Sequence, residues 1–260
     1  MIRIESSSNT LFKQTKKLLT RSGRKKTGSF IIEGERIVRD AANGRAKLQY
    51  IFVSDSFGEA LCEDFGGVRI YSLPDKLFDE LKSTVNSQGI LAVADYIDSD
   101  LDEIDFTKGC YLYLDSVADP GNMGTIIRSA DAFGADGIIL SSGCVDVFNP
   151  KVLRSTMSGI FNIKLYFDDG TLPVFYEKGF RIIGTFPDGA SSSADFEYSD
   201  KCVIVMGNEA NGICPQIEKY CTHRVTIPMT GGAESLNVSV ACGIMLYEAF
   251  IHRDFKRGDD

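Results

Sequence analysis

Five short runs of apolar residues in the second half of the chain constrain its fold more than any other feature. They occupy residues 110–115, 137–142, 180–186, 201–207 and 223–229. Apolar and polar residues do not strictly alternate within them, which predicts strands buried on both faces, as in parallel sheets. Helical patterns separate the runs, and alternating strands and helices are typical of α/β layer structures. The second half is therefore predicted to form an α/β domain around a mostly parallel sheet.

The first part of the chain shows the same alternation. Strand-like runs cover residues 49–55, 68–74 and 89–96. Residues 74–84 fit a helix with Pro74 at its first position, where helices tolerate proline. This pattern predicts another α/β domain, smaller than the one in the second half of the chain.

A strongly acidic stretch separates the two parts. Residues 95–105 contain six acidic residues and no basic one. Such a segment cannot bury itself, so it predicts a solvated linker. We therefore predict a first domain over residues 1–95, an acidic linker over 96–107 and a second domain over 108–260.

Composition narrows the compartment and the chemistry. No apolar run reaches the roughly 18 residues that a membrane span needs, and the first ten residues lack the apolar core of a signal peptide. The seven cysteines are scattered without a Cys-x-x-Cys pair, and there are only two histidines. These counts argue against a disulfide framework and against a zinc site. The sequence thus predicts a cytoplasmic protein that binds neither membrane nor metal.

Charge is distributed unevenly along the chain. The formal net charge of −8 argues against binding to nucleic acid, which usually requires a basic footprint. Residues 1–30 differ, because they hold eight basic residues against the single acid Glu5. Within them, residues 21–29 read RSGRKKTGS and predict a mobile basic loop. From the residues alone this loop is either a solvated surface or a phosphate contact.

Polar loops follow three of the predicted buried strands. They cover residues 116–134, 208–213 and 230–237. In open α/β sheets ligands bind beyond the carboxyl ends of the strands, so these loops predict three walls of one pocket. None of them has the Gly-x-Gly-x-x-Gly spacing of a dinucleotide site or the lysine of a P-loop. A small-molecule nucleotide enzyme of ordinary doubly wound topology is therefore disfavoured.

Three segments of the second domain resemble the motifs of a known family. They read LDSVADPGNMGTIIRSADAFGADGIIL (114–140), VIVMGNEANGI (203–213) and IPMTGGAESLNVSVACGIMLYEA (227–249). In this order and spacing they resemble the SpoU, or TrmH-like, RNA ribose 2′-O-methyltransferases of the SPOUT class. The first domain, with FIIEGERIV at residues 30–38, resembles over a shorter match the L30e-like RNA-binding domain of ribosomal-RNA members.

The resemblance implies a fold and a cofactor. It implies a methyltransferase domain with a trefoil knot and a mostly parallel sheet, preceded by a small L30e-like α/β domain. It implies S-adenosylmethionine as the methyl donor, held by backbone groups around Gly207, Ile227 and Leu236, with Thr185 contributing. It also implies a homodimer that forms through the second domain.

The resemblance further implies five catalytic candidates, and each has an ordinary structural alternative. Arg128 is the main candidate for activating the 2′-hydroxyl, with Glu209 beside it. Because a free arginine has a pKa above about 12, orienting the hydroxyl and the adjacent phosphate is its easier role. A surface salt bridge is the alternative for Arg128, and Glu209 could instead stabilise a helix N-terminus. Asn122 could be a turn residue, and Ser235 and Asn237 could only cap a helix.

The expected activity is S-adenosylmethionine-dependent methyl transfer to a ribose 2′-hydroxyl, with 23S-type ribosomal RNA favoured by the L30e-like front domain. The expected RNA contacts are Arg21, Arg24, Lys25 and Lys26. A transfer-RNA 2′-O-methyltransferase stays as an alternative, as does a non-catalytic RNA-binding protein of the same fold. The complete set of pocket residues argues against the non-catalytic alternative.

Overall fold

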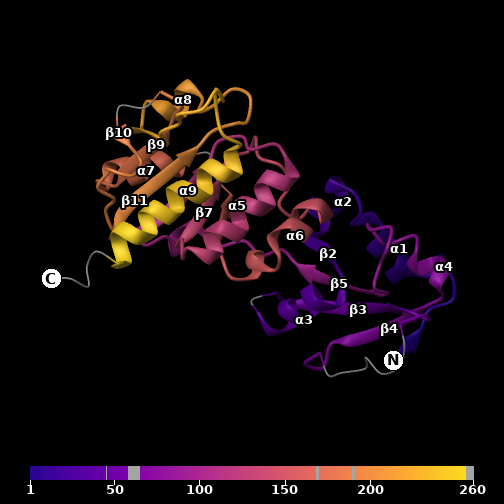
Figure 1. Cartoon of the computed structure of the whole chain (residues 1–260). Coiled ribbons are helices and arrows are strands. Elements are labelled where there is room, and N and C mark those ends of the chain that lie inside the picture. The colour runs from indigo at the N-terminus through magenta and orange to yellow at the C-terminus, as the bar shows by residue number, and fades with distance from the viewer. Residues whose placement is uncertain (45, 58–64, 168–169, 189–190, 256–260) are drawn as a thin grey trace. The chain divides into compact units, whose positions relative to one another are not determined.

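The computed structural model describes residues 1–44, 46–57, 65–167, 170–188 and 191–255, and they form two units (Figure 1). Unit 1 comprises Met1–Ile97 together with Phe148–Asn162, and unit 2 comprises Asp98–Val147 together with Ile163–Asp260. The sequence pattern had no signal for the return of residues 148–162 to unit 1. The Phe148 ring explains that return, because its centroid lies 4.7 Å from that of Phe30 and 4.1 Å from that of Tyr96.

Unit 1 is built on a five-stranded mixed sheet. Its strands are β1 (Ile2–Arg3), β2 (Ser29–Glu33), β3 (Leu48–Ser54), β4 (Arg69–Leu73) and β5 (Ile90–Asp95), in the order β1-β4-β3-β5-β2. Strand β5 runs antiparallel to both β3 and β2. The helices are α1 (Thr10–Lys17), α2 (Arg21–Thr27), α3 (Glu35–Asn43), α4 (Asp75–Phe78) and α6 (Pro150–Thr156), followed by the 3-10 turn η3 (Gly159–Phe161). Phe12, Phe52 and Leu73 lie in its buried core.

Unit 2 is built on a seven-stranded sheet. Its strands are β6 (Gly109–Leu114), β7 (Gly137–Leu140), β8 (Leu165–Phe167), β9 (Arg181–Thr185), β10 (Ser191–Ser192), β11 (Lys201–Met206) and β12 (His223–Thr226). Their order is β10-β12-β9-β11-β6-β7-β8, and each pairing between these strands is parallel. The predicted mostly parallel sheet is therefore confirmed.

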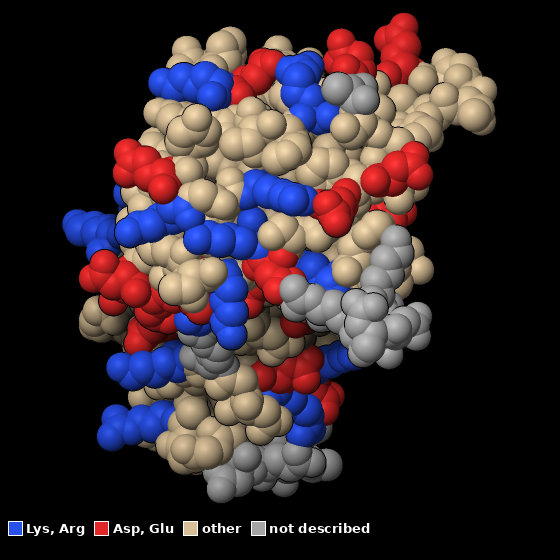
Figure 2. Space-filling view, turned by 90° about the vertical axis from the view of Figure 1, so that its left-hand side faces the viewer, with Lys and Arg blue, Asp and Glu red and all other residues tan. Residues whose placement is uncertain are grey.

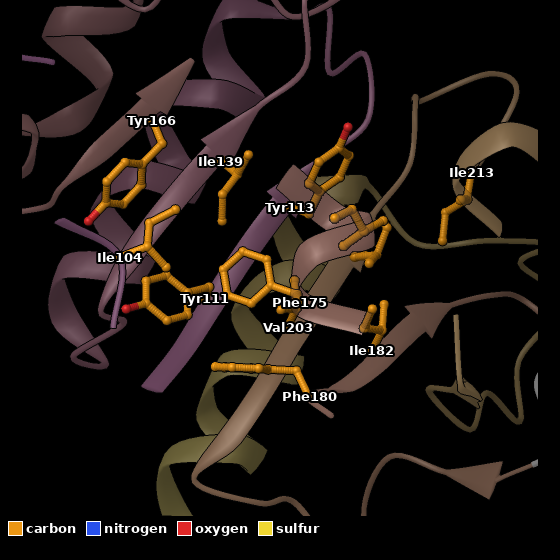
Figure 3. Close-up of a cluster of buried hydrophobic side chains, with 12 residues drawn as sticks. Ile104, Tyr111, Tyr113, Ile139, Tyr166, Phe175, Phe180, Ile182, Val203 and Ile213 are labelled. Carbon is orange, nitrogen blue, oxygen red and sulfur yellow. The ribbon is translucent and has the colours of Figure 1, made fainter. Parts of the chain in front are cut away.

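Three of the described helices of unit 2 lie between its strands along the chain, and the fourth follows the last strand. They are α5 (Pro120–Ala132), α7 (Thr171–Glu177), α8 (Pro215–Glu218) and α9 (Val238–Phe250), with the 3-10 turn η2 (Leu101–Glu103) before the sheet and the π-helical turn η4 (Ile251–Phe255) after α9. Aromatic rings fill much of the core on one face of the sheet (Figure 3). There the Phe175 ring lies 5.2 Å from Tyr111 and 4.8 Å from Phe180, measured between centroids.

The predicted acidic linker is only partly solvated. Its acidic side chains Asp98, Asp102 and Asp105 are exposed, as expected. Ile104 in the same stretch is 6% exposed and belongs to the core of unit 2. The sequence interpretation missed this because it rested on the acidic residues of the stretch and not on the apolar residues among them, which are Ile97, Leu101, Ile104 and Phe106. In the described chain, no helix combines the length and the apolar character that crossing a membrane requires.

Candidate active site

A cavity of about 530 Å³ opens at the carboxyl ends of the central strands of unit 2. The loops that follow β9, β11 and β12 form its walls, together with the first turn of α5. Eight of the nine pocket residues predicted from the sequence line it: Asn122, Thr185, Gly207, Glu209, Ile227, Ser235, Leu236 and Asn237. Parallel strands bring these loops together because all their carboxyl ends meet at one edge of the sheet.

The loop after β11 closes tightly on itself. The backbone N–H of Asn208 donates to the carbonyl of Gly212, and the N–H of Gly212 donates back to the carbonyl of Asn208, each at 2.9 Å. A Cβ atom at Gly207 would lie 2.2 Å from the carbonyl carbon of Gly212. Only glycine therefore permits this closure, which fixes where Glu209 projects.

Two further residues hold this loop, and the sequence interpretation missed both. Asp115, at the end of β6, is 4% exposed, and its carboxylate accepts a hydrogen bond from the Cys214 backbone N–H at 2.7 Å. Asn208 donates through Nδ2 to the carbonyl of Ser116 at 2.8 Å. The position of Asp115 directly after a buried strand was the available signal, because a polar side chain there faces the site edge of the sheet.

A chain of hydrogen bonds links all three predicted loops. Asn122 donates through Nδ2 to Oε1 of Glu209 at 3.0 Å. Asn122 Oδ1 accepts a hydrogen bond from Nδ2 of Asn237 at 2.9 Å. The amide of Asn122 thus has one partner on each side. These contacts connect the start of α5, the loop after β11 and the start of α9.

Glu209 lies at the amino end of α5. Its carboxylate accepts hydrogen bonds from the backbone N–H groups of Ala118 at 3.1 Å and Asp119 at 2.9 Å, in addition to Asn122. Burial favours its neutral form, but the hydrogen bonds from Asn122, Asp119 and Ala118 outweigh burial and lower its pKa. The side chain is therefore an anion at neutral pH, with little tendency to take up a proton.

Asn237 both caps a helix and lines the cavity. Its Oδ1 accepts hydrogen bonds from the backbone N–H of Ser239 at 2.9 Å and of Val240 at 3.4 Å, and from Ser239 Oγ at 2.6 Å. This is the side-chain capping geometry expected at the start of α9. Its Nδ2 faces Asn122. The capping role and the pocket role are therefore compatible in one residue.

Arg128 does not line the cavity. It lies on α5, where its side chain is exposed and makes no hydrogen bond or ion pair to any residue that the structure describes. The carboxylate of Glu209, expected beside Arg128, instead contacts Asn122. Asn122 and Arg128 are six positions apart on α5, which does not place them on one helix face.

The cavity wall offers a mixed surface to a bound molecule. Met206, Met229 and Ala241 supply apolar atoms, and the glycines at 207 and 212 expose backbone. The hydroxyl of Thr185 is buried and has no hydrogen-bond partner among the described residues. Since a buried polar atom without a partner is costly, this hydroxyl is suited to bonding a ligand.

The basic segment of unit 1 is a helix, and the predicted loop was wrong. Thr20 caps α2 by accepting a hydrogen bond from the Gly23 N–H at 3.1 Å, and Gly28 ends it with a φ of 62°. A Cβ atom at Gly23 would lie 1.9 Å from the carbonyl oxygen of Lys17, so α2 packs directly against the end of α1. Thr20 and Gly28 are capping residues that could have signalled this helix.

The four basic candidates on α2 do not behave alike. Arg21, Lys25 and Lys26 are exposed. Arg24 is 3% exposed, and its Nη1 donates to the carbonyl of Leu18 at 2.8 Å. The expectation that Arg24 contacts RNA is therefore not met by its position, because the side chain is used inside the corner between α1 and α2.

Comparisons with known proteins match the first and the second part of the chain to different family models. The SpoU rRNA Methylase family model matches residues 109–247, and the MRM3-like substrate binding domain matches residues 9–92. The chain is 33% identical to the 23S rRNA (guanosine(2553)-2′-O)-methyltransferase RlmP of Bacillus subtilis, over 95% of this chain and 98% of that protein. It is 28% identical to the 23S rRNA (uridine(2479)-2′-O)-methyltransferase of Streptomyces viridochromogenes, over 95% of this chain and 92% of that protein.

Solved structures resemble the whole chain as well. The AdoMet-bound rRNA methyltransferase from Sinorhizobium meliloti superposes with a TM-score of 0.87 at 30% identity, covering 96% of this chain and 98% of that one. The SpoU methyltransferase AviRb from Streptomyces viridochromogenes, in complex with AdoMet, superposes with a TM-score of 0.82 at 28% identity, covering 94% and 98%.

Proposed function

The chain belongs to the SpoU rRNA methylase family, and from that premise we propose that it transfers a methyl group from S-adenosylmethionine to a ribose 2′-hydroxyl of ribosomal RNA. One observation carries the proposal. The three motif loops meet at a single cavity, and the hydrogen bonds from Asn237 to Asn122 and from Asn122 to Glu209 join them there.

The residues present fit S-adenosylmethionine. The molecule combines an aromatic base, a ribose and an amino-acid tail, so it needs both apolar walls and hydrogen-bonding groups. Met206 and Ala241 supply apolar surface, and the backbone at Gly207, Ile227 and Leu236 lines the same cavity. The unpartnered hydroxyl of Thr185 adds a polar group that a ligand can satisfy.

The protein's contribution to the chemistry is alignment. S-adenosylmethionine supplies a methyl group bonded to a positively charged sulfur, and its transfer needs the 2′-oxygen in line with that bond. Ser235 and Asn237 lie on the cavity wall where they can hold the ribose, and Asn122 fixes the orientation of Asn237. Holding two reactants in a productive geometry supplies several kcal/mol of the lowered barrier.

The hydrogen bonds of Glu209 support a positioning role for this residue. Its carboxylate already accepts four hydrogen bonds, the fourth from Asn208 Nδ2 at 3.5 Å, and its lowered pKa makes it a weak base. Arg128 remains the group proposed to orient the 2′-hydroxyl and a neighbouring phosphate. Its exposed guanidinium suits bidentate binding to a phosphate group.

Ribosomal RNA is preferred over transfer RNA because of the relatives that match nearly the whole chain. Two relatives that align over nearly their whole length are named as 23S rRNA methyltransferases. A tRNA-modifying TrmH/SpoU enzyme of A. aeolicus covers only 58% of this chain.

The proposed phosphate contacts in unit 1 are three exposed basic residues on α2: Arg21, Lys25 and Lys26. On the face in Figure 2, basic and acidic side chains lie side by side.

A homodimer through unit 2 is supported by an apolar stripe on α9. Val240 and Tyr247 are 50% and 48% exposed, and Gly243 and Ile244 between them are half-buried. Their spacing of three and four residues puts them on one helix face, while Cys242, Met245 and Leu246 face the core. An apolar face left uncovered on an otherwise buried helix is typical of a subunit interface. The trefoil knot and the cytoplasmic location remain predictions from the family and the sequence.

A single experiment separates the proposed substrate from its alternatives. Purified protein is incubated with labelled S-adenosylmethionine and with separate pools of unmodified ribosomal and transfer RNA. The proposal expects label in ribosomal RNA alone. Label in transfer RNA alone favours the transfer-RNA enzyme, and no label in either pool favours the non-catalytic RNA-binding protein.

A further inference from the structure

The cavity wall formed by the residues after β9 is tied to the neighbouring strand β12. Thr185, Phe186 and Pro187 line the cavity there, and the buried hydroxyl of Thr185 has no partner among the described residues. The N–H of Phe186 donates to the carbonyl of Val225 at 2.9 Å, and Thr226 Oγ1 donates to the carbonyl of Pro187 at 2.9 Å. The position of this wall therefore depends on β12.

The register of the two strands places an arginine over the Phe186 ring. Arg224 on β12 is the Cα partner of Gly184 on β9, so the two positions lie on the same face of the sheet. Phe186 follows Gly184 by two residues and lies on that face as well. A Cβ atom at Gly184 would lie 2.5 Å from Cε2 of Phe186. The absence of a side chain at Gly184 therefore lets the ring fold back along the strand.

The guanidinium of Arg224 stacks on this ring. Its central carbon lies 3.6 Å from the centroid of the Phe186 ring. Its Nη1 donates to Oε1 of Glu218 on α8, and its Nη2 lies 3.6 Å from Oδ1 of Asp188. The ring also packs against the aromatic core of unit 2, to which Ile182 belongs (Figure 3). A guanidinium attracts an aromatic face, and the two carboxylates keep this one over the ring.

The stacked ring determines where its neighbours in the wall lie. Side chains alternate along an extended strand, so Thr185 points to the opposite face from Phe186. Holding the Phe186 ring therefore fixes the adjoining backbone and, with it, the Thr185 hydroxyl. Arg224 is not among the described residues that line the cavity. Its effect on a bound molecule is indirect, either through the wall or through the field of its charge.

We propose that Arg224 is a positioning residue of the cofactor site, which sets the wall at residues 185–187 by stacking on Phe186. The proposal rests on the proposed function, which makes S-adenosylmethionine the occupant. A wall that is already ordered favours binding, because less conformational freedom is lost when the ligand binds. The charge of Arg224 has the opposite effect, since it repels the positively charged sulfur of S-adenosylmethionine. S-adenosylhomocysteine, the product left after methyl transfer, separates the two effects because its sulfur is neutral.

The test compares four variants of the full-length protein. Arg224→Ala removes the stacked group, Arg224→Lys keeps the charge without the planar group, and Phe186→Leu removes the ring. Arg181→Ala is the matched control, because the Arg181 side chain on β9 is 39% exposed and paired with Glu197, whereas that of Arg224 is 40% exposed. Calorimetry without RNA gives the Kd of S-adenosylmethionine and of S-adenosylhomocysteine. The KM for each substrate and the melting temperature are measured in parallel.

We expect Arg224→Ala and Phe186→Leu each to weaken the binding of both molecules about fivefold, as the loss of one cation–π contact predicts. Arg224→Lys should fall between Arg224→Ala and the wild type, because an ammonium group cannot lie flat on the ring. Combining Arg224→Ala with Phe186→Leu should weaken binding little more than either change alone, because the two side chains act as one unit. The KM for S-adenosylmethionine should rise by the same factor, and the KM for RNA should not. Arg181→Ala should bind both molecules as the wild type does.

Wild-type affinity for both molecules in Arg224→Ala overturns the positioning role, and so does an equal loss in Arg181→Ala. Tighter binding of S-adenosylmethionine with unchanged binding of S-adenosylhomocysteine also overturns it, because the charge then acts and the stack does not. If Arg224→Ala does not fold, Arg224→Lys and Phe186→Leu decide by the same criteria. A wild-type protein that binds neither molecule contradicts the proposed function itself and the role of Arg224 with it.

Discussion

At the residue scale, the amide of Asn122 is the link on which the site geometry depends. It donates to Glu209 and accepts from Asn237, so both ends of the amide are in use. Replacing Nδ2 with an oxygen in Asn122→Asp sets two carboxylates about 3.0 Å apart, at the distance that the donor now spans. Like charges this close repel, and one of them takes up a proton with a raised pKa.

Asn122→Asp should therefore reduce kcat about a hundredfold at pH 8, a loss comparable with removing a positioned donor from an active site. Activity should partly return as the pH falls towards 6, because the proton shared by the two carboxylates restores one hydrogen bond. The measurement is the pH profile of kcat for the variant and the wild type. Wild-type kcat at pH 8 contradicts the role assigned to Asn122.

Arg128 provides a separate test at the same scale. Its side chain is exposed and lies outside the cavity lining, so its removal should not disturb the cofactor site. We expect Arg128→Ala to abolish methyl transfer while the calorimetric affinity for S-adenosylmethionine stays within a few-fold. Unchanged transfer removes Arg128 from the mechanism, and a large loss of cofactor affinity shows that it acts through the cofactor site.

At the element scale, helix α2 carries one buried cation with a structural role and further cations that are exposed on the surface. Arg24 is buried and donates to Leu18, whereas Lys25 and Lys26 are exposed. Arg24→Gln should lower the free energy of unfolding by about 2 kcal/mol, as expected for a lost hydrogen bond from a charged group. It should leave the salt dependence of RNA binding intact.

The double variant Lys25→Glu with Lys26→Glu should show the opposite result. Its thermal stability should match the wild type, while its RNA binding weakens. The slope of log affinity against log salt concentration should become shallower by up to about two, because two phosphate contacts are lost. Thermal melts and salt titrations of RNA binding measure the two effects. An RNA defect with Arg24→Gln and none with the double variant contradicts this division of roles.

The elements also show which parts of the structure the sequence could predict. The run at 201–207 became β11 at Lys201–Met206, because a strand buried on both faces needs apolar residues throughout. The basic segment was expected to be a loop because it is highly charged and contains glycines. Its capping residues, Thr20 and Gly28, were not recognised as the ends of a helix. The corner formed by Gly23 and Lys17 depends on packing between two helices, which periodicity does not report.

The site was predictable to a similar extent. Eight predicted pocket residues line one cavity because loop positions after parallel strands converge, whatever their separation along the chain. Asp115 was missed because its partner Cys214 lies 99 residues away. The return of Phe148 to unit 1 was missed for the same reason, since its ring contacts Phe30 across the chain.

At the scale of the whole molecule, the apolar stripe on α9 predicts the assembly. Tyr247→Glu places a charge on the exposed face that also carries Val240 and should dissociate the proposed dimer. Light scattering should change from twice the 28.6 kDa chain mass to a single chain mass. Tyr176→Glu, at a tyrosine on α7 that is 51% exposed, is the control and should remain dimeric. A wild-type protein that is already monomeric contradicts the assembly.

The central claim concerns the chemical position of the methyl group, and alkaline hydrolysis of the labelled RNA tests it most directly. Alkali cleaves RNA through the free 2′-hydroxyl, so a 2′-O-methyl group blocks cleavage at that nucleotide. The account predicts that label from S-adenosylmethionine is recovered from ribosomal RNA in alkali-resistant dinucleotides at one position. Recovery of the label in mononucleotides, as a methylated base, contradicts it.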